Sequence, residues 1–381
     1  MLDISTKKVA LFIETSTSYG RSLIRGIVQY ANIATKWFFY NEPRGLQDTI
    51  PDLVNWKLDG IIMRDTDNNM ALLKLNIPTI VSVRYRDKID GLTSIIGNSL
   101  AIGKTAADYF KNKGFKYFAY CGFHAMPWSR EREEAFFNAL SPGENSYLYH
   151  NPGTNIDYDQ DVRHIASWLK KLPIPSALLA CNDVRAAHVL EACKIADIRV
   201  PQQIAVLGVN NDDMICNLTS PPLSSISLNT VKAGYEAAKT LDTLMSSPSH
   251  NDNKDIVVEP QGVLSRQSTD VFAINDPDMA QALYYITNRA RHPIQVNDVV
   301  SYVGSNRRTL ERKFQRTINK SIYEAIKHTR INLMSNMLLE TDLSITAIAH
   351  NMGFQNHHHI SRYFKSARGI SPLKFRNLNC V

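Results

Sequence analysis

"SALLACNDVRAAHVLEACKIADIRVPQQIAVLGV", residues 176–209, is the stretch that decides the fold of most of this chain. It begins with the apolar run 176–181, continues with helical spacing over 183–196 and ends with the apolar run 204–209. Continuous apolar runs of strand length on either side of a helix are typical of parallel strands that are buried on both faces. The stretch therefore predicts a strand–helix–strand unit of a parallel sheet.

The same alternation extends over the residues before and after this unit. Further apolar runs of strand length occur at 9–13, 36–40, 59–63, 77–83 and 115–123, and stretches with helical spacing lie at 18–32, 98–114, 159–172 and 229–245. This is too much chain for one small sheet. We expect two doubly wound α/β subdomains with a cleft between them, because ligands of open α/β sheets bind outside the carboxyl ends of the strands.

The positive charge of the chain is concentrated in its last hundred residues. The formal net charge is +7, and residues 277–381 hold 15 Lys and Arg against 6 Asp and Glu, whereas residues 1–276 hold 28 against 30. A basic terminal module on a nearly neutral body indicates a polyanionic partner, since contacts to phosphates release counterions. A merely solubilising face would have the same composition.

Cysteine usage and hydropathy indicate a cytoplasmic protein. The five cysteines are scattered and form no C-x-x-C pair, which suits a reducing compartment. The first apolar run, 9–13, has only five residues, too few for a signal sequence or a membrane span, so we expect no membrane association.

Residues 1–276 contain no catalytic signature. G-x-S-x-G, Walker A, H-E-x-x-H and a G-x-G-x-x-G after the first strand are all missing, so we expect no enzyme, no cofactor and no metal. The residues that follow the predicted strands are amides, carboxylates and guanidinium groups, together with a tryptophan, for example in 14–21, 124–132 and 210–212. Such side chains suit a polyol, which needs hydrogen bonds to hydroxyls and a ring against the apolar sugar face.

Residues 177–241 resemble the effector-binding domain of LacI-type repressors and periplasmic sugar-binding proteins. The resemblance rests on an Asn-Asp after a strand, a Val-Pro before the strand 204–209, and "PPLSSI" followed by a helix. It implies that Arg132, Asn182, Asp183 and Asn210 line a sugar site, with Trp128 as a candidate stacking ring. The family usually has Asp at the position of Asn210. Helix capping or turn formation is the alternative role of such strand-end residues.

After residues 266–278 the pattern changes to helices only. We therefore divide the chain into a sensor domain, 1–265, a linker, 266–276, and an all-α domain, 277–381. Within the last domain, 296–314 and 345–364 repeat each other, with apolar residues and a glycine aligned.

Each copy of the repeat predicts a helix-turn-helix, over about 296–316 and 345–366. Gly304 and Gly353 would end the first helix with a positive φ, and Asn306 and Asn356 would cap the second. The first turns of the second helix would contact base edges. The residues expected to face outward there are Arg307, Arg308, Glu311, Arg312, His357, His358, Ser361 and Arg362.

Basic residues on the flanks of the motifs would contact phosphates. They are Lys313, Arg316, Lys320, Lys365, Arg368 and Lys374. The run His357–His359 does not predict a metal site, because consecutive helical residues point about 100° apart and cannot converge on one ion. His359 is expected nearer the helix packing seam.

The last hundred residues resemble the AraC/XylS-type DNA-binding domain over its whole length. The matching features include Arg330, the Ile348–Ala349 pair, Gly353–Phe354, Phe364 and Pro372. A LacI-like sensor followed by this domain resembles the activators of bacterial xylose operons. That resemblance implies a dimeric transcription activator with double-stranded DNA, D-xylose and RNA polymerase as partners. Recognition of another sugar, or a carbohydrate-active enzyme with a DNA-binding appendage, are the alternatives.

Overall fold

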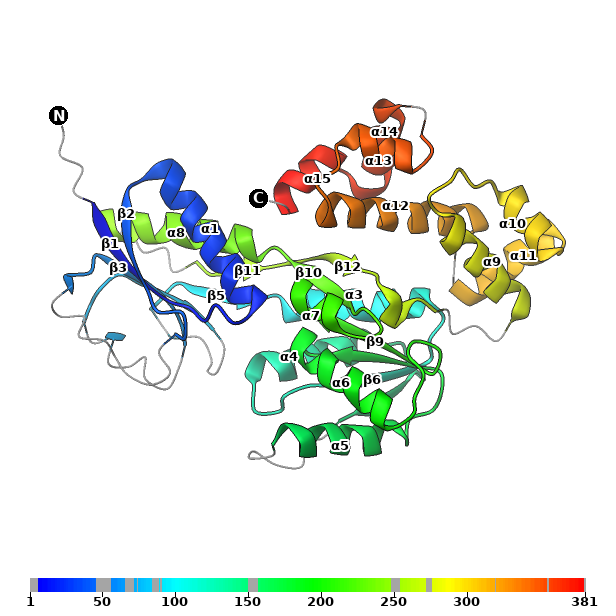
Figure 1. Ribbon diagram of the computed structural model, residues 1–381, viewed down its shortest axis with the longest axis horizontal. Helices are drawn as coiled ribbons and strands as arrows, with labels where there is room; N and C mark the ends of the chain where they lie inside the picture. Colours follow the sequence, from blue (N-terminus) through cyan, green and yellow to red (C-terminus); the bar gives the residue numbers. More distant parts are fainter. Residues whose placement is uncertain are drawn as a thin grey trace.

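Two mostly parallel sheets and a helical domain make up the computed structural model of the chain (Figure 1). The structure describes residues 6–45, 56–65, 72–73, 75–83, 89, 91–149, 157–247, 254–271, 276–318, 320–354 and 356–379. Within these residues, no helix is long and apolar enough to cross a membrane. We call the part with the sheets the α/β domain and the part from residue 276 onward the helical domain.

The N-lobe of the α/β domain is a six-stranded sheet of order β11-β5-β4-β3-β1-β2, in which all pairs are parallel. Its strands are β1 (Lys7–Phe12), β2 (Trp37–Asn41), β3 (Gly60–Arg64), β4 (Thr79–Ser82), β5 (Ser94–Gly97) and β11 (Ile256–Val258). Helices α1 (Ser18–Ala34) and α8 (Thr230–Ser246) pack on it.

The C-lobe is a second six-stranded sheet, of order β12-β10-β9-β8-β6-β7. Its strands are β6 (Tyr117–Cys121), β7 (Asn145–Leu148), β8 (Ser176–Ala180), β9 (Ile204–Val209), β10 (Ser224–Leu228) and β12 (Pro260–Leu264), and its helices are α3 (Ser99–Asn112), α4 (Pro127–Asn138), α5 (Tyr158–Leu169), α6 (Asp183–Ile195) and α7 (Asp213–Leu218). The pair β10–β12 is antiparallel, and the other pairs are parallel. The predicted pair of doubly wound subdomains is confirmed, with this one antiparallel edge.

Helices α1 and α8 of the N-lobe cross at two glycines. A Cβ atom on Gly26 would clash with the carbonyl oxygen of Val231, and one on Gly234 would clash with the carbonyl oxygen of Leu23. The two backbones therefore touch directly, and each glycine is required by the closeness of the other helix.

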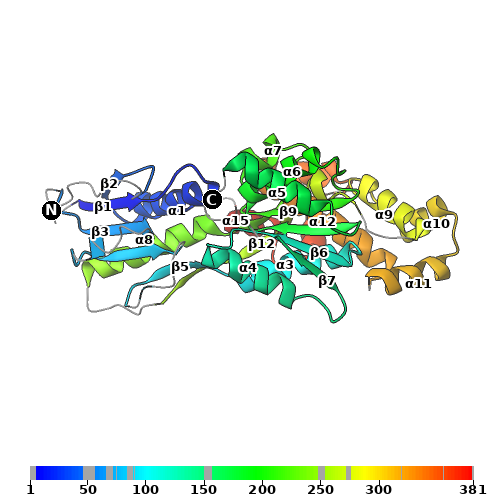
Figure 2. The ribbon, with the colours of Figure 1, turned by 90° about the horizontal axis from the view of Figure 1, so that it is seen from below.

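The helical domain consists of two small cores that share one long helix. Its helices are α9 (Pro277–Arg289), α10 (Val296–Val303), α11 (Arg307–Ile318), α12 (Ile322–Glu340), α13 (Ile345–Asn351), α14 (His357–Arg368) and α15 (Pro372–Asn379). The first core contains α9, α10, α11 and the start of α12, and the second contains the rest of α12 with α13, α14 and α15. Figure 2 shows α9, α10 and α11 projecting beyond the C-lobe, away from the N-lobe.

Arg330 in the middle of α12 joins the two cores. It is 5% exposed, and its guanidinium donates to the carbonyl of His292, which precedes α10, and to that of Met352, which follows α13, at 2.7 Å in the second case. The same guanidinium lies 5.0 Å from the centroid of the Phe354 ring.

 One buried cation therefore holds the loop before the first motif and the turn of the second motif against the same helix.

Candidate functional site

The carboxyl ends of the parallel strands of both lobes lie opposite each other where the lobes meet, and we call this junction of the lobes the cleft, as predicted from the sequence. On the N-lobe side, Glu14 follows β1 and Arg64 ends β3, and the two form an ion pair of 2.8 Å. The Arg64 guanidinium also lies 4.9 Å from the centroid of the Tyr19 ring, at the start of α1. The Tyr19 hydroxyl is 3.2 Å from the hydroxyl of Ser82, which ends β4.

Three chain crossings connect the lobes and form a hinge behind the cleft. They lie at Asn98, Asn229 and Glu259, between β5 and α3, β10 and α8, and β11 and β12. The Asn98 amide donates to the Glu259 carboxylate at 2.8 Å, and the Glu259 backbone N–H donates to the Asn229 side chain at 2.8 Å. The hinge strands are thus joined by side-chain hydrogen bonds that are independent of the sheets.

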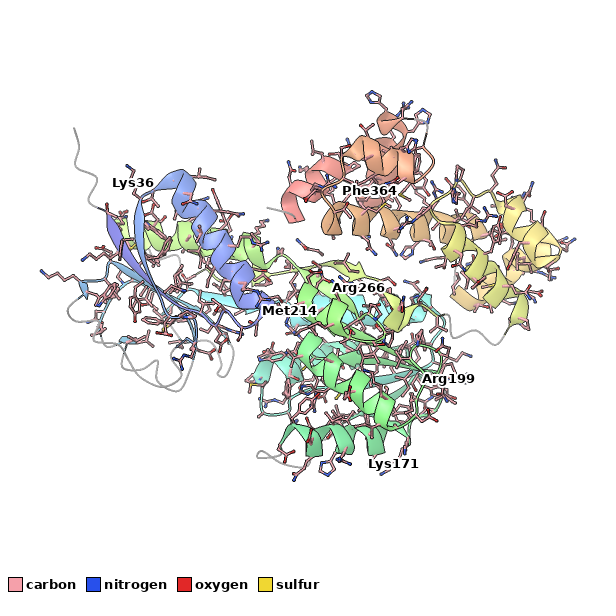
Figure 3. The ribbon with its side chains drawn as sticks, in the orientation of Figure 1. Lys36, Lys171, Arg199, Met214, Arg266 and Phe364 are labelled. Atoms are coloured by element: carbon pink, nitrogen blue, oxygen red, sulfur yellow. The ribbon has the colours of Figure 1, made fainter. Side chains whose placement is uncertain are left out.

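Asp212 links the two lobes through its side chain. One of its oxygens caps α7 by accepting from the Ile215 N–H at 3.4 Å. The other accepts from the Ser18 N–H at 3.0 Å and from the Arg21 guanidinium at 3.4 Å, both on the N-lobe. Figure 3 shows Met214, at the start of α7, where the N-terminal end of α1 approaches the C-lobe.

Arg132 and Trp128 form the C-lobe wall of the cleft. Arg132 is 7% exposed, its guanidinium donates to the Cys181 carbonyl at 2.6 Å, and it lies 4.9 Å from the centroid of the Trp128 ring. Burial lowers the pKa of Arg132, and Tyr19 and Asp183 are close enough to raise it again. The structure thus places Arg132 beside Trp128, with Tyr19 of the opposite lobe close to Arg132.

Asp183 lies in the same region but is fully engaged within the protein. It is 1% exposed, and its two carboxylate oxygens accept from the Ser225 hydroxyl at 2.5 Å and from the Asp212 N–H at 2.7 Å. Burial raises the pKa of Asp183 to about 7, against the effect of these two hydrogen bonds. Its geometry is that of a group that positions the neighbouring Asp212.

Asn182 and Asn210 have local structural roles as well. The Asn182 side chain caps α6 by accepting from the Arg185 N–H at 2.8 Å. Asn210 has a φ of 105°, and its N–H donates to the Ile226 carbonyl at 2.9 Å, so it forms the turn that follows β9. Both residues are half-buried at the ends of strands that lead into the cleft.

Three buried nitrogen atoms of the cleft residues lack a hydrogen-bond partner among the described residues. They are Nε of Arg64, Nε1 of Trp128 and Nε of Arg132. A buried donor without a partner costs about 1–3 kcal/mol, so such groups usually mark a missing ligand or water. These three donors would suit the hydroxyl oxygens of a small polyol.

The sequence reasoning missed Arg64 and Asp212 as individual cleft residues. Arg64 directly follows the apolar run 59–63, in the same position relative to its strand as the polar residues that were considered. Asp212 is the third residue after β9, whereas the resemblance directed attention to Asn210. Position at a strand end could have identified Arg64, but not the crossing of Asp212 to the other lobe.

Both predicted helix-turn-helix motifs are present in the helical domain. Gly304 and Gly353 each have a φ of 69°. Gly304 ends α10, and Gly353 lies in the turn that follows α13. Asn356 caps α14 by accepting from the His358 and His359 N–H groups at 3.1 and 3.0 Å, and Asn306 accepts from the Arg308 N–H at 2.9 Å.

The buried stripes of α11 and α14 leave most predicted base-contacting residues at the surface. Leu310, Phe314, Ile360 and Phe364 are fully buried. The exposed predicted residues are Arg307, Arg308, Arg312, His358 and Arg362, and Glu311 and Ser361 are half-buried. The side chain of His357 lies outside the described residues, and His359 is exposed, so its expected place near the packing seam is wrong.

Glu311 and Lys313 on α11 are engaged within the helical domain. The Glu311 carboxylate accepts from the Ile322 N–H, at the start of α12, at 3.2 Å. Lys313 forms ion pairs of 2.8 Å with Asp276 and 2.7 Å with Asp278, which raise its pKa. A DNA phosphate would have to compete with two carboxylates for Lys313.

The other predicted phosphate-contacting residues divide into two groups. Arg316, Lys365 and Lys374 are exposed. Arg368 is exposed as well, but its guanidinium donates to the Asn332 side chain on α12 at 3.2 Å. Lys320 is half-buried and faces the α/β domain, in a region described below.

Two further observations concern metals and thiols. Within the described part of the chain, no group of three or more His, Cys, Asp or Glu side chains could hold a metal ion. Cys121, Cys181, Cys193 and Cys216 are buried free thiols, and burial raises the pKa of each of them.

Comparison with known proteins joins these two regions in one architecture. Residues 107–269 match a periplasmic binding protein-like domain, and residues 299–378 match a helix-turn-helix domain. The xylose operon regulatory protein of Haemophilus influenzae is 31% identical, with 98% of each chain covered, and that of Escherichia coli K12 is 28% identical, with 98% of this chain and 97% of the relative covered.

A solved structure extends the similarity to the whole fold. The structure of the xylose-binding transcription activator XylR covers 99% of both chains with a TM-score of 0.63 and 25% sequence identity. The relatives are regulators of transcription and not enzymes. The chain therefore belongs to the family of the xylose operon regulatory proteins and is a sugar-responsive, DNA-binding transcription regulator.

Proposed function

We propose that this chain is a cytoplasmic transcription activator that D-xylose switches by binding in the cleft between the two lobes. The observation that carries the proposal is the set of buried donors without a partner, Arg64 Nε, Trp128 Nε1 and Arg132 Nε, which line one cleft in a chain similar to xylose operon regulators over its whole length. In this proposal the three donors bind hydroxyl oxygens, and the Trp128 ring covers the apolar face of the sugar.

The other residues predicted to bind the sugar support these three donors. Asn182, Asp183 and Asn210 are proposed to shape the site, with Asp183 holding Asp212 through its N–H. Asp212 already contacts Ser18 and Arg21 of the N-lobe, so a sugar that joins this contact would favour the closed arrangement of the lobes. A ligand shifts such an equilibrium only through its different affinity for the two arrangements.

The helical domain is placed to respond to a movement of the lobes. It contacts the C-lobe, where the Asn336 amide donates to the Ser265 carbonyl at 3.4 Å, and it contacts the N-lobe, where α15 lies against α8. A rotation of one lobe relative to the other would therefore act on both ends of the helical domain. We propose that residues 1–265 sense the sugar, that 266–276 link the domains, and that 277–381 bind DNA.

Both helix-turn-helix motifs are proposed to read one DNA site. Helix α12 has 19 residues, which corresponds to about 28 Å of helix, comparable with the ~34 Å between successive major grooves. The proposed base-contacting residues are Arg307, Arg308, Arg312, His357, His358, Ser361 and Arg362, with Glu311 as a neighbour that positions α11. Arg316 and Lys365 are proposed to contact phosphates. A homodimer that recruits RNA polymerase would complete the activator.

Calorimetric titration of the purified chain with D-xylose tests the sensor site, with L-arabinose, D-ribose and D-glucose as controls. We expect binding of D-xylose alone, a loss of at least a hundredfold in affinity with Arg132→Ala, and a loss of up to about tenfold with Trp128→Phe, which removes one N–H. Trp37→Phe is the matched control, because Trp37 Nε1 is also buried without a partner among the described residues but lies beside Tyr30, away from the cleft.

Two results would change the proposal. Heat with another sugar and none with D-xylose would keep the cleft and replace the effector. Equal losses with Trp128→Phe and Trp37→Phe would show that the unpartnered donor of Trp128 does not contact the sugar.

A further inference from the structure

A cleft of about 330 Å3 separates the α/β domain from the helical domain. The α/β domain contributes the end of α3 and the segment after β12, and the helical domain contributes α9, the end of α11 and α12. The cleft lies at the lower end of the ~300–1,000 Å3 typical of small-molecule sites. Figure 3 shows Arg266, one of its lining residues, between the C-lobe and α12.

Positive charge from both domains converges on this cleft. Lys113 and Arg266 line it from the α/β domain, and Lys320 lines it from the helical domain. An adjoining hollow shares Lys320, His328 and Asn332 with the cleft and adds Lys327 and Arg368.

The described lining of the cleft and the hollow holds fewer acidic than basic side chains, namely Asp270 and Glu324 against Lys113, Arg266, Lys320, Lys327 and Arg368. Asp270 is exposed at the edge. The Glu324 carboxylate is already bound to the Ser321 N–H at 2.7 Å and to the Ser321 hydroxyl at 2.8 Å, in the capping box of α12. The cleft is therefore an electropositive site that both domains build.

Burial and neighbouring cations both disfavour protonation of His328, which lines the cleft. Burial, followed by the charges of Lys320, Arg368 and Lys113, lowers the pKa of His328 to about 4. Burial also lowers the pKa of Lys320, against the opposing charge of Glu324, and it lowers the pKa of Arg368. An anion bound beside Lys320 and Arg368 would offset part of the cost of burying their charges.

The rest of the lining suits an organic body with a hydroxyl group. Leu283, Ile318 and Ala325 form a buried apolar floor. The Oδ1 atom of Asn336 is a buried acceptor with no partner among the described residues, while its amide nitrogen donates to the Ser265 carbonyl. A ligand hydroxyl could donate to that oxygen.

We propose that this interdomain cleft binds a hydroxylated phosphate monoester of the size of a sugar phosphate. The phosphate lies between Lys113 and Lys320, the carbon chain lies on the apolar floor, and a hydroxyl donates to Asn336 Oδ1. Because residues of both domains line the cleft, the bound anion favours this arrangement of the domains.

Arg266 connects this cleft with the turn that follows β9. Its guanidinium donates to the Asn211 side chain and to the Leu223 carbonyl, both at 3.0 Å. Asn211 lies directly before Asp212, so one arginine lines the interdomain cleft and touches the loop that reaches the N-lobe. The proposed binding of the anion does not depend on which sugar binds in the cleft between the two lobes.

Calorimetric titration of the full chain with ribose 5-phosphate, without D-xylose and without DNA, tests the proposal. Ribose and inorganic phosphate are the two reference probes, each lacking one half of the ligand. We expect ribose 5-phosphate to bind, with affinity reduced about tenfold by Lys113→Gln and by Lys320→Gln. Lys320→Arg keeps the charge and should retain most of the affinity. Lys104→Gln is the matched control, since Lys104 also lies on α3 but is exposed and paired with Asp108 at 2.8 Å.

Several outcomes would overturn the proposal. They are absence of binding at millimolar ribose 5-phosphate, equal affinity for inorganic phosphate and ribose 5-phosphate, and a loss with Lys104→Gln equal to that with Lys113→Gln. The melting temperature of each variant, measured without ligand, shows whether a loss reflects unfolding. Retained D-xylose binding by a variant that no longer binds ribose 5-phosphate would separate this site from the sugar cleft and support the proposal.

Discussion

The two helix-turn-helix motifs share a backbone plan but are attached to the molecule differently. Gly304 and Gly353 have the same φ of 69°, and the phenylalanines Phe314 and Phe364 are both fully buried. The first motif is attached to α9 through the ion pairs of Lys313, whereas the turn of the second contacts Pro293 and the buried Arg330. A local repeat thus fixes the shape of each motif, and non-local contacts decide how firmly each motif is held.

The largest expected effect separates the two cores. Phe314→Ala and Phe364→Ala should each cost about 3–5 kcal/mol of stability in their own core, because each deletes a buried ring. Hydrogen exchange should rise in α10 and α11 with Phe314→Ala, and in α13 and α14 with Phe364→Ala. Exchange that rises equally in both motifs with either variant would show that the two cores unfold as one.

The glycines of the two turns should differ in how much stability they lose on substitution by alanine. Gly304→Ala places an alanine in the left-handed conformation that Gly304 adopts, at a cost of about 1–2 kcal/mol. No other atom lies within 4 Å of the new Cβ. Gly353→Ala adds a Cβ 2.7 Å from Cδ of Pro293 and should cost more. Thermal unfolding of the two variants measures the difference, and equal losses would mean that the loop of Pro293 moves aside freely.

Base recognition should be divided between the motifs. Arg308→Ala or Arg312→Ala should lower discrimination in one half of the DNA site by about 1–3 kcal/mol, and Arg362→Ala should do so in the other half. Lys365→Ala should instead weaken binding to all sequences and reduce its dependence on salt. Competition binding with operator variants distinguishes the two effects. Unchanged footprints in Arg308→Ala and Lys365→Ala together would contradict the assignment of this face.

The effect that is smallest near neutral pH is a pH dependence of stability from His328 on α12. The pKa of His328 on α12 is lowered to about 4, so the unfolded chain takes up this proton as the pH falls below about 6.5, while the folded chain does not. The contribution to stability is therefore present above pH 6.5 and declines as the pH falls toward 4. His328→Gln should flatten that decline in pH-dependent unfolding, and an unchanged slope would exclude His328 as its source.

Much of the fold follows from local patterns. The long apolar runs predicted β1, β6, β8 and β9, and the repeat of glycine and apolar residues predicted both motifs. The short β11, with three residues, and the polar β7 gave no comparable pattern. Their places depend on neighbouring strands that are distant in the sequence.

The sites were predictable only where one segment supplies the whole arrangement. Trp128 and Arg132 lie four residues apart on one helix, and they do contact each other. The link from Asp212 to Ser18 spans 194 residues, and that from Lys313 to Asp276 spans 37. Spacing along the sequence carries no information on such distant pairs. Lys313 was therefore predicted to contact a DNA phosphate, whereas in the structure it is paired with carboxylates of the protein itself.

The crossing of α1 and α8 has a mechanical consequence. At Gly26 and Gly234 no side chain lies between the two helices, so no rotamer change can absorb a displacement. A shift of Ser18 or Tyr19, at the start of α1, must carry α8 with it, and α8 lies against α15 of the helical domain. Because the two backbones are in direct contact, we expect this pair of helices to move as one rigid body, so that a small displacement at one end is transmitted to the other.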